Sequence, residues 1–175
     1  MAMGKITPSR AASSPKSVKH RVFVIEDHPL MRRSIVEALE READLVVCGQ
    51  AEDAPEAMSA IVSLQPDIVL TDIQLKTSNG LDLIKVLREQ APTLPIVATT
   101  MFDVRRNERL ARAAGASGFV SKHDGPEKLI ATVHEVLQAG KELNAKALRD
   151  FGQTTEFAAM KKKTNKPNER KNENS

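Results

Sequence analysis

Hydrophobic and polar residues follow two alternating sequence patterns in the middle of the chain. Short, continuous apolar runs recur five times, and each is followed by a longer stretch with an apolar residue every three or four positions. The short runs indicate strands buried on both faces, and the longer stretches indicate amphipathic helices. The expected strands lie at 22–25, 45–48, 67–72, 95–100 and 118–121.

Proline and glycine mark the ends of the expected helices. These helices begin near Pro29, near Pro55, after the Asn79-Gly80 turn, near Asp103 and at Pro126. Pro29 suits the first turn of a helix, with Asp27 or His28 near its cap, and Pro92 ends the third helix. Gly140 lies where a glycine commonly ends a helix, so the last helix is expected at 126–138. Five strand–helix units predict a doubly wound parallel α/β sheet with helices on both faces.

Charge divides the chain into three parts. The net charge of +3 is the sum of +4 in residues 1–20, +4 in residues 141–175 and −5 in residues 21–140. Residues 1–20 hold few large apolar groups and are expected to form a disordered basic tail. One acidic globular domain is expected at 21–140, followed at 141–175 by a helical extension and a disordered basic tail.

Targeting and redox signals favour a cytoplasmic protein. No apolar run approaches the ~20 residues that cross a bilayer, and no apolar segment follows the basic N-terminus as in a secretory signal. The single cysteine, Cys48, excludes an intrachain disulfide and fits a reducing compartment. Because Cys48 lies in an expected strand, we predict a buried structural thiol.

Polar side chains gather where the expected strands end. They are Glu26, Asp27, Asp72, Thr99, Thr100 and Lys122. The carboxyl ends of the strands in such a sheet meet at one edge, so these groups are expected in one cleft. Three carboxylates there repel one another unless a cation lies among them, and hard oxygen ligands favour Mg²⁺. An ammonium and a hydroxyl beside that ion suit an incoming phosphoryl group.

Each of these residues, taken alone, also has an explanation that involves no function. Glu26 and Asp27 would stabilise the start of the first helix through its dipole. Asp72 would suit a turn, and Lys122 would be a solvated surface lysine. Phe119, inside the fifth expected strand, would be an ordinary core residue. The joint arrangement favours the functional interpretation.

Four segments carry a resemblance to a known family. They are VFVIEDHPLMRRSIVEALE, PDIVLTDIQLKTSNGLDLI, PIVATTMFD and GASGFVSKHDGPEKLIATV. Together they resemble a response-regulator receiver domain of the CheY-like type, in the NarL, FixJ and LuxR branch, over residues 21–140. The resemblance implies a flavodoxin-like (βα)5 three-layer sandwich with sheet order 2-1-3-4-5.

The resemblance also implies a role for each residue of the acidic cluster. Asp72 matches the phosphoacceptor, and Glu26 and Asp27 match the acidic pair that holds Mg²⁺, with Asp27 the more direct ligand. Gln74 is expected to offer its backbone carbonyl to the ion. His28 and His123 are not spaced as a metal pair, and the family does not use them as phosphodonors.

Three further positions match the family's switch. Thr100 matches the switch hydroxyl, in preference to Thr99, and Lys122 matches the lysine that pairs with phosphoryl oxygens. Phe119 matches the aromatic switch residue. The departures are Lys76, where proline is common, and the bulky Phe102 two positions past Thr100.

The function implied is that of a single-domain response regulator in a two-component phosphorelay. A sensor histidine kinase or a phosphotransfer protein would phosphorylate Asp72 with Mg²⁺, and the chain would catalyse only its own phosphorylation and dephosphorylation. The switch would alter the surface of the fourth helix, fifth strand and last helix to control an output protein or a homodimer. Only about 35 residues follow Gly140, and they are too few and too polar for a helix-turn-helix output domain.

Two alternatives stay open. The first is a transcription-related adaptor whose lysines at 161–163 and 166 contact nucleic-acid phosphates. The absence of Trp and Tyr disfavours base stacking, so nucleic acid is not the expected partner. The second alternative is a pseudo-receiver that takes no phosphate, and the intact set of acidic residues argues against it.

Overall fold

The structure, a computed structural model, describes the backbone of residues 18–153 and the side chains of residues 18–143. Most of both expected tails, including the lysines at 161–163 and 166, lies outside the described residues. Five parallel strands form one sheet in the order β2-β1-β3-β4-β5, which confirms the fold prediction. The strands are β1 (His20–Ile25), β2 (Leu45–Ala51), β3 (Ile68–Asp72), β4 (Ile96–Thr100) and β5 (Gly118–Ser121).

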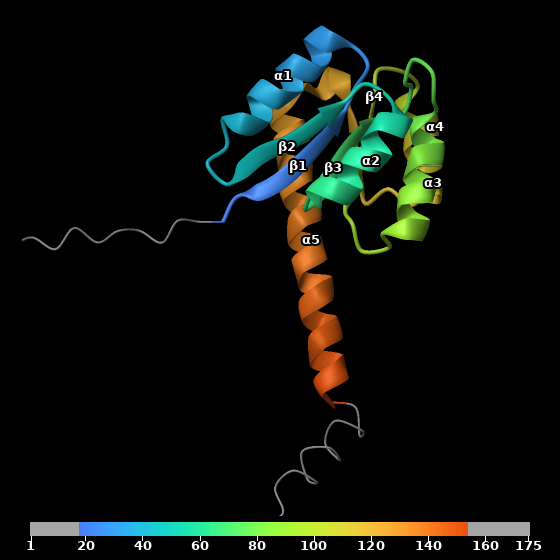
Figure 1. Cartoon of the computed structure of the whole chain (residues 1–175). Coiled ribbons are helices and arrows are strands. Elements are labelled where there is room, and N and C mark those ends of the chain that lie inside the picture. The colour runs from blue at the N-terminus through green and yellow to red at the C-terminus, as the bar shows by residue number, and fades with distance from the viewer. Residues whose placement is uncertain (1–17, 154–175) are drawn as a thin grey trace, which may run out of the picture.

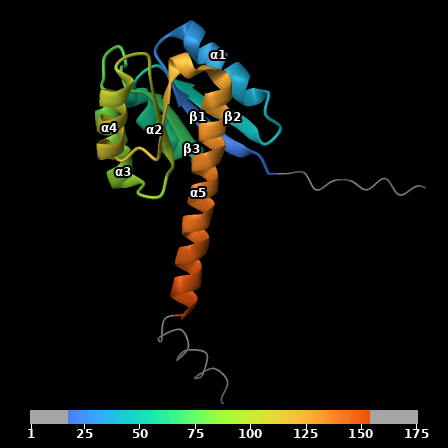
Figure 2. The same cartoon turned by 180° about the vertical axis from the view of Figure 1, so that it is seen from behind.

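Helices cover both faces of the sheet (Figures 1 and 2). One face carries α1 (Pro29–Glu40) and α5 (Gly125–Gln153), and the other carries α2 (Ala54–Leu64), α3 (Gly80–Gln90) and α4 (Val104–Ala114). Alternation along β1 explains this division, because Val22 and Val24 pack under α1 and α5 while Phe23 and Ile25 pack under α2 and α3. Both sets are buried, so the strands appear in the sequence as continuous apolar runs.

The prediction that Gly140 ends the last helix is wrong. Helix α5 continues through Gly140 to Gln153 and extends beyond the sheet (Figure 1). A glycine inside a helix costs about 1 kcal/mol relative to alanine, which is too little to end a helix that good helix formers continue. Lys141, Glu142 and Leu143 are such residues.

The burial of Cys48 also differs from the prediction. The register between β1 and β2 shifts by one residue: Val22 pairs with Val47, and the next residue, Phe23, pairs with Gly49. Cys48 therefore has no partner residue in β1. Its side chain is half-buried and not fully enclosed. Burial still raises the pKa of the Cys48 thiol.

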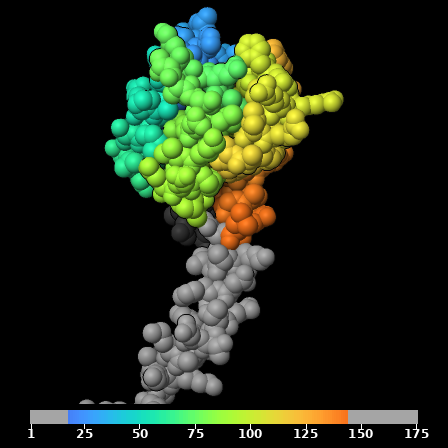
Figure 3. All heavy atoms as spheres, turned by 90° about the vertical axis from the view of Figure 1, so that its right-hand side faces the viewer, coloured from blue at the N-terminus to red at the C-terminus, as the bar shows by residue number. Residues whose placement is uncertain are grey.

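The loop after β3 is constrained by one glycine. A Cβ atom at Gly80 would lie 1.9 Å from the backbone oxygen of Asp72, so only glycine allows this close approach. The side chain of Asn79 caps α3 by accepting a hydrogen bond from the Leu81 N–H at 2.8 Å. These contacts fix the start of α3 against the end of β3, and α3 and α4 lie side by side on the face shown in Figure 3. Within residues 18–153, no helix has the length and apolarity needed to cross a membrane.

Candidate functional site

Three charged side chains meet at the carboxyl edge of the sheet. Glu26 follows β1, Asp72 ends β3, and Lys122 begins the short 3-10 turn η1 (Lys122–Asp124) after β5. The Lys122 Nζ atom lies 2.5 Å from Glu26 Oε2 and 2.6 Å from Asp72 Oδ2. The three side chains are only 1%, 6% and 4% exposed for Glu26, Asp72 and Lys122. The structure therefore places one buried ammonium between two buried carboxylates.

The Glu26 carboxylate is only partly satisfied by this arrangement. Burial raises its pKa above the usual value, and this effect outweighs the nearby ammonium of Lys122, which acts in the opposite direction. Although Oε2 lies close enough to Lys122 for an ion pair, that contact does not have hydrogen-bond geometry, and the atom has no other hydrogen-bond partner among the described residues. Oε2 therefore faces the Lys122 ammonium as a buried charge partner and not as a hydrogen-bond acceptor.

Asp27 and His28 extend the acidic cluster toward solvent. His28 Nδ1 lies 3.0 Å from Asp27 Oδ1 and 3.5 Å from Glu26 Oε1. One ligand atom from each of the three residues lies within 4.8 Å of the others. The Asp27 side chain is 13% exposed, whereas that of His28 is 75% exposed. The donors are mainly hard carboxylate oxygens, so this group fits Mg²⁺.

Two backbone contacts position this cluster. The Gln74 N–H donates to Asp72 Oδ1 at 3.2 Å, so the residue expected to supply a carbonyl already contacts the expected phosphoacceptor. The metal contact of that carbonyl stays a prediction. Arg32 on α1 donates to the Glu26 carbonyl at 2.6 Å and to Glu52 Oε1 at 2.7 Å. Sequence reasoning missed Arg32, because a single arginine in an amphipathic helix gives no signal of a contact with a distant loop.

The expected switch hydroxyl forms its hydrogen bonds with residues outside this cluster. Thr100 is fully buried at the end of β4, and its Oγ1 atom hydrogen-bonds with the backbone of Phe102 and the side chain of Asn107. The neighbouring Thr99 pairs with Asp72 across the two strands, and its own hydroxyl donates to the Thr71 carbonyl. Sequence reasoning missed Asn107, which lies in a helix otherwise dominated by arginine.

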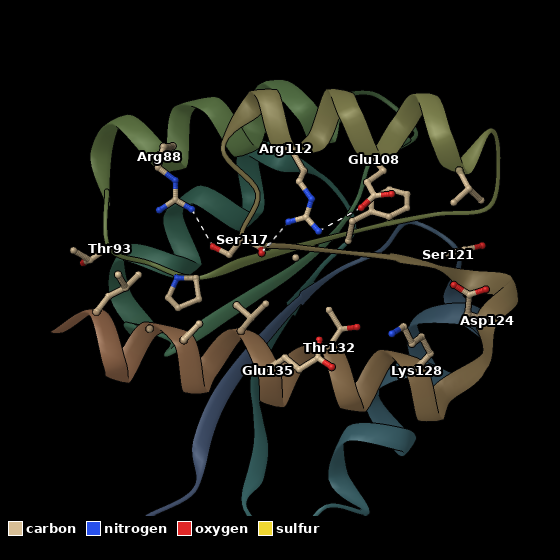
Figure 4. A pocket seen from close by; sticks show the side chains of 18 of the residues that line it. Arg88, Thr93, Glu108, Arg112, Ser117, Ser121, Asp124, Lys128, Thr132 and Glu135 are labelled. Carbon is tan, nitrogen blue, oxygen red and sulfur yellow. Dashed lines mark hydrogen bonds and ion pairs between the residues drawn. The ribbon is translucent and has the colours of Figure 1, made fainter. Parts of the chain in front are cut away.

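Phe119 lines a groove between α4 and α5, which Figure 4 shows from close by. This groove has a volume of about 700 Å³, and its lining does not include Glu26, Asp72 or Lys122. Arg112 crosses its upper wall, donating to Glu108 Oε1 and to the Ser117 carbonyl, both at 3.3 Å. Phe119 is half-buried within β5 and packs against the core under α3 and α4. A change in its orientation would alter the floor of this groove.

Comparisons with known proteins agree with this geometry. The model of the family described as "Response regulator receiver domain" matches residues 22–134. The nitrate/nitrite response regulator NarP of Escherichia coli is 32% identical over 126 residues, which are 72% of this chain and 57% of NarP. The DNA-binding transcriptional activator DevR/DosR of Mycobacterium tuberculosis is 32% identical over 123 residues, 70% of this chain and 56% of that protein. The chain thus spans less than two thirds of these curated relatives.

Solved structures show the same fold. A two-component response regulator of the LuxR family from Aurantimonas gives a TM-score of 0.67 at 29% identity, covering 69% of this chain and 86% of that one. The signal receiver domain of the NarL response regulator from Mycobacterium tuberculosis gives a TM-score of 0.64 at 27% identity, covering 69% of this chain and 98% of that domain.

Proposed function

The chain belongs to the response regulator receiver family of two-component systems, with relatives of the NarL and LuxR types, and we propose that Asp72 is its phosphoacceptor. The donor would be a phosphohistidine on a sensor kinase or a phosphotransfer protein. The observation that carries the proposal is the ammonium of Lys122, held 2.6 Å from the Asp72 carboxylate inside a buried acidic cluster. A cation so placed stabilises the negative charge of an arriving phosphoryl group.

The proposed transfer is a displacement at phosphorus. One Asp72 carboxylate oxygen forms a bond to phosphorus while the bond from phosphorus to the donor's imidazole nitrogen breaks. The imidazole keeps the electron pair of that bond and later takes a proton from solvent. Lys122 would exchange its contact with the Asp72 oxygen for the new phosphoryl oxygens. Glu26, Asp27, Asp72 and the Gln74 carbonyl would hold Mg²⁺, whose charge would offset that of the phosphoryl oxygens.

The output of this reaction would be a shift between two packings. Thr100 and Phe119 lie on the adjacent strands β4 and β5, where Thr100 pairs with Ser121. The phosphoryl group would attract the Thr100 hydroxyl, and Phe119 would turn toward the space that Thr100 leaves. This change would reshape the surface of α4, β5 and α5, where a partner protein would bind.

Labelling with acetyl phosphate and Mg²⁺ tests the proposal. Wild-type protein should gain a phosphoryl group that hydroxylamine removes, because hydroxylamine cleaves acyl phosphates. Asp72→Asn should gain none. Asp82→Asn is the matched control, since Asp82 is an exposed carboxylate on α3 whose Lys85 partner is also exposed. Undiminished labelling of Asp72→Asn would refute the assignment, and an unlabelled wild-type protein would favour the pseudo-receiver alternative.

A further inference from the structure

The hydrogen-bonding capacity of the Thr100 hydroxyl is used in full by groups other than Asp72. It accepts from the Phe102 N–H and from Asn107 Nδ2, and it donates to the Phe102 carbonyl, each at 3.2 Å. A hydroxyl has one donor and two acceptor sites, so all its capacity is used. Thr100 is also 0% exposed, so solvent does not replace a partner that is lost.

Asn107 is the only side chain among these partners. Its Nδ2 atom also donates to the Phe102 carbonyl at 2.7 Å, so one amide group joins the end of β4 to the following loop. The amide orientation follows from its partners. A reversed amide would place its oxygen against the Phe102 carbonyl, which has no proton to give.

The segment between Thr100 and Asn107 is closed by further bonds. Asp103 takes up the left-handed region, with φ 33° and ψ 66°, and its side chain caps α4 by accepting from the Arg106 N–H at 3.3 Å. The Asn107 N–H donates to the Asp103 carbonyl at 2.9 Å. A non-glycine residue in this region is strained and persists only where its surroundings hold it. The loop is therefore fixed at both ends, and Asn107 takes part in the bonds at each end.

We propose that Asn107 is a positioning residue that holds the Thr100 hydroxyl away from Asp72 until the phosphoryl group arrives. This inference rests on the proposed phosphoacceptor role of Asp72. For Thr100 to reach a phosphoryl oxygen, its hydroxyl must give up the hydrogen bond from Asn107. That bond therefore stabilises the resting packing relative to the phosphorylated packing. Asn107 thereby sets how far a given phosphoryl ligand shifts the equilibrium between the two packings.

The substitution Asn107→Ala removes the bond from the resting packing alone. A single hydrogen bond of this kind changes such an equilibrium by about two- to tenfold. The full-length variant should therefore bind beryllofluoride, an acyl-phosphate mimic, at a half-saturating concentration lower by about two- to tenfold than that of wild type. Acetyl phosphate should also label N107A faster. Its melting temperature should fall, because the resting fold loses the same bond.

Threonine methyl NMR of the full chain with Mg²⁺ and beryllofluoride gives the readout, with the Thr100 resonance assigned by Thr100→Val. The control is Arg105→Ala, an exposed position on the same turn of α4, which should bind like wild type. In the T100V background, adding N107A should change neither labelling nor half-saturation, because the partner hydroxyl is already gone. A purely structural role for Asn107 would lower the melting temperature without tightening beryllofluoride binding.

Two results would overturn the inference while leaving the phosphoacceptor role intact. The first is that wild-type protein binds beryllofluoride and that N107A binds it with the same or weaker affinity. The other is a tightening that persists in the T100V background, which would place the effect elsewhere. A wild-type protein that binds no beryllofluoride and takes no phosphoryl group would overturn the proposed function itself, and this inference with it.

Discussion

Replacing Lys122 with methionine should destabilise the protein strongly near neutral pH. The substitution keeps the length of the side chain but removes the only ammonium within 2.6 Å of the Glu26 and Asp72 carboxylates in the described structure. Unit charges at such distances attract by about 6 kcal/mol per pair at an effective dielectric constant of about 20. Desolvation of the buried ions offsets much of that attraction, and breaking a buried pair costs about 3–5 kcal/mol in practice. We therefore expect Lys122→Met to lower the free energy of unfolding by about 3 kcal/mol.

The loss should depend on pH and on divalent ions. Without the ammonium, the buried Glu26 carboxyl holds a proton more tightly in the folded protein than in the unfolded chain, because burial and the Asp72 charge both raise its pKa. The variant should therefore regain stability as the pH falls toward about 4, where unfolded carboxyl groups titrate. Millimolar Mg²⁺ should also restore part of the loss, because it binds the folded acidic cluster and not the unfolded chain.

Urea unfolding followed by far-UV circular dichroism measures this effect, since the chain has no Trp or Tyr to report by fluorescence. A loss of about 3 kcal/mol lowers the urea midpoint by about 1–3 M for a domain of this size. Lys128→Met is the matched control, because Lys128 is exposed on α5 and should lose little stability. An unfolding free energy for Lys122→Met that equals the wild-type value, or that falls as the pH is lowered from 8 to 5, would refute the reasoning.

Other changes near the site should have opposite effects on stability. Gly80→Ala places a Cβ atom 1.9 Å from the Asp72 backbone oxygen and should cost about 3 kcal/mol or more. Gly140→Ala meets only Pro95 Cγ, at 3.6 Å, so it should raise the free energy of unfolding by about 0.5–1 kcal/mol; a loss would contradict the continuous α5 helix. Glu26→Gln should gain stability relative to wild type as the pH rises from acid to neutral, measured by urea unfolding, because it removes a carboxylate whose charge is disfavoured by burial. Burial raises the pKa of Glu26, so wild type loses stability as the pH rises from 4.5 through that raised pKa. The variant has no carboxylate at this position, so its advantage in unfolding free energy over wild type should vanish at lower pH. An advantage that does not change with pH would contradict the burial argument.

The strands and their polar ends could be predicted from the sequence because they depend on local order. A buried parallel strand appears as a continuous apolar run, and the carboxylate or lysine that follows it must lie at the carboxyl edge of the sheet. The position of each residue at a strand end therefore predicts that Glu26, Asp72 and Lys122 lie close together. The family resemblance supplied what spacing alone did not, namely which of two adjacent threonines to expect as the switch and the strand order itself.

The features that sequence reasoning missed depend on contacts between elements. Arg32 and Asn107 lie in helices where any polar residue would satisfy the pattern, and only the packed loops show what each side chain reaches. Gly140 had the right residue type for a helix end, but the residues beyond it favour continuing the helix. The half-buried state of Cys48 follows from a shift in strand register, which a run of apolar residues does not encode.

Chemical mapping of the phosphorylated residue tests the central claim most directly. Borohydride reduces an aspartyl phosphate to homoserine, so treatment of the full-length chain after incubation with acetyl phosphate and Mg²⁺ marks the acceptor for peptide mass spectrometry. Homoserine is expected at position 72 alone, dependent on both acetyl phosphate and Mg²⁺. A reduced residue at Asp27 or another carboxylate, with Asp72 unchanged, would contradict that claim.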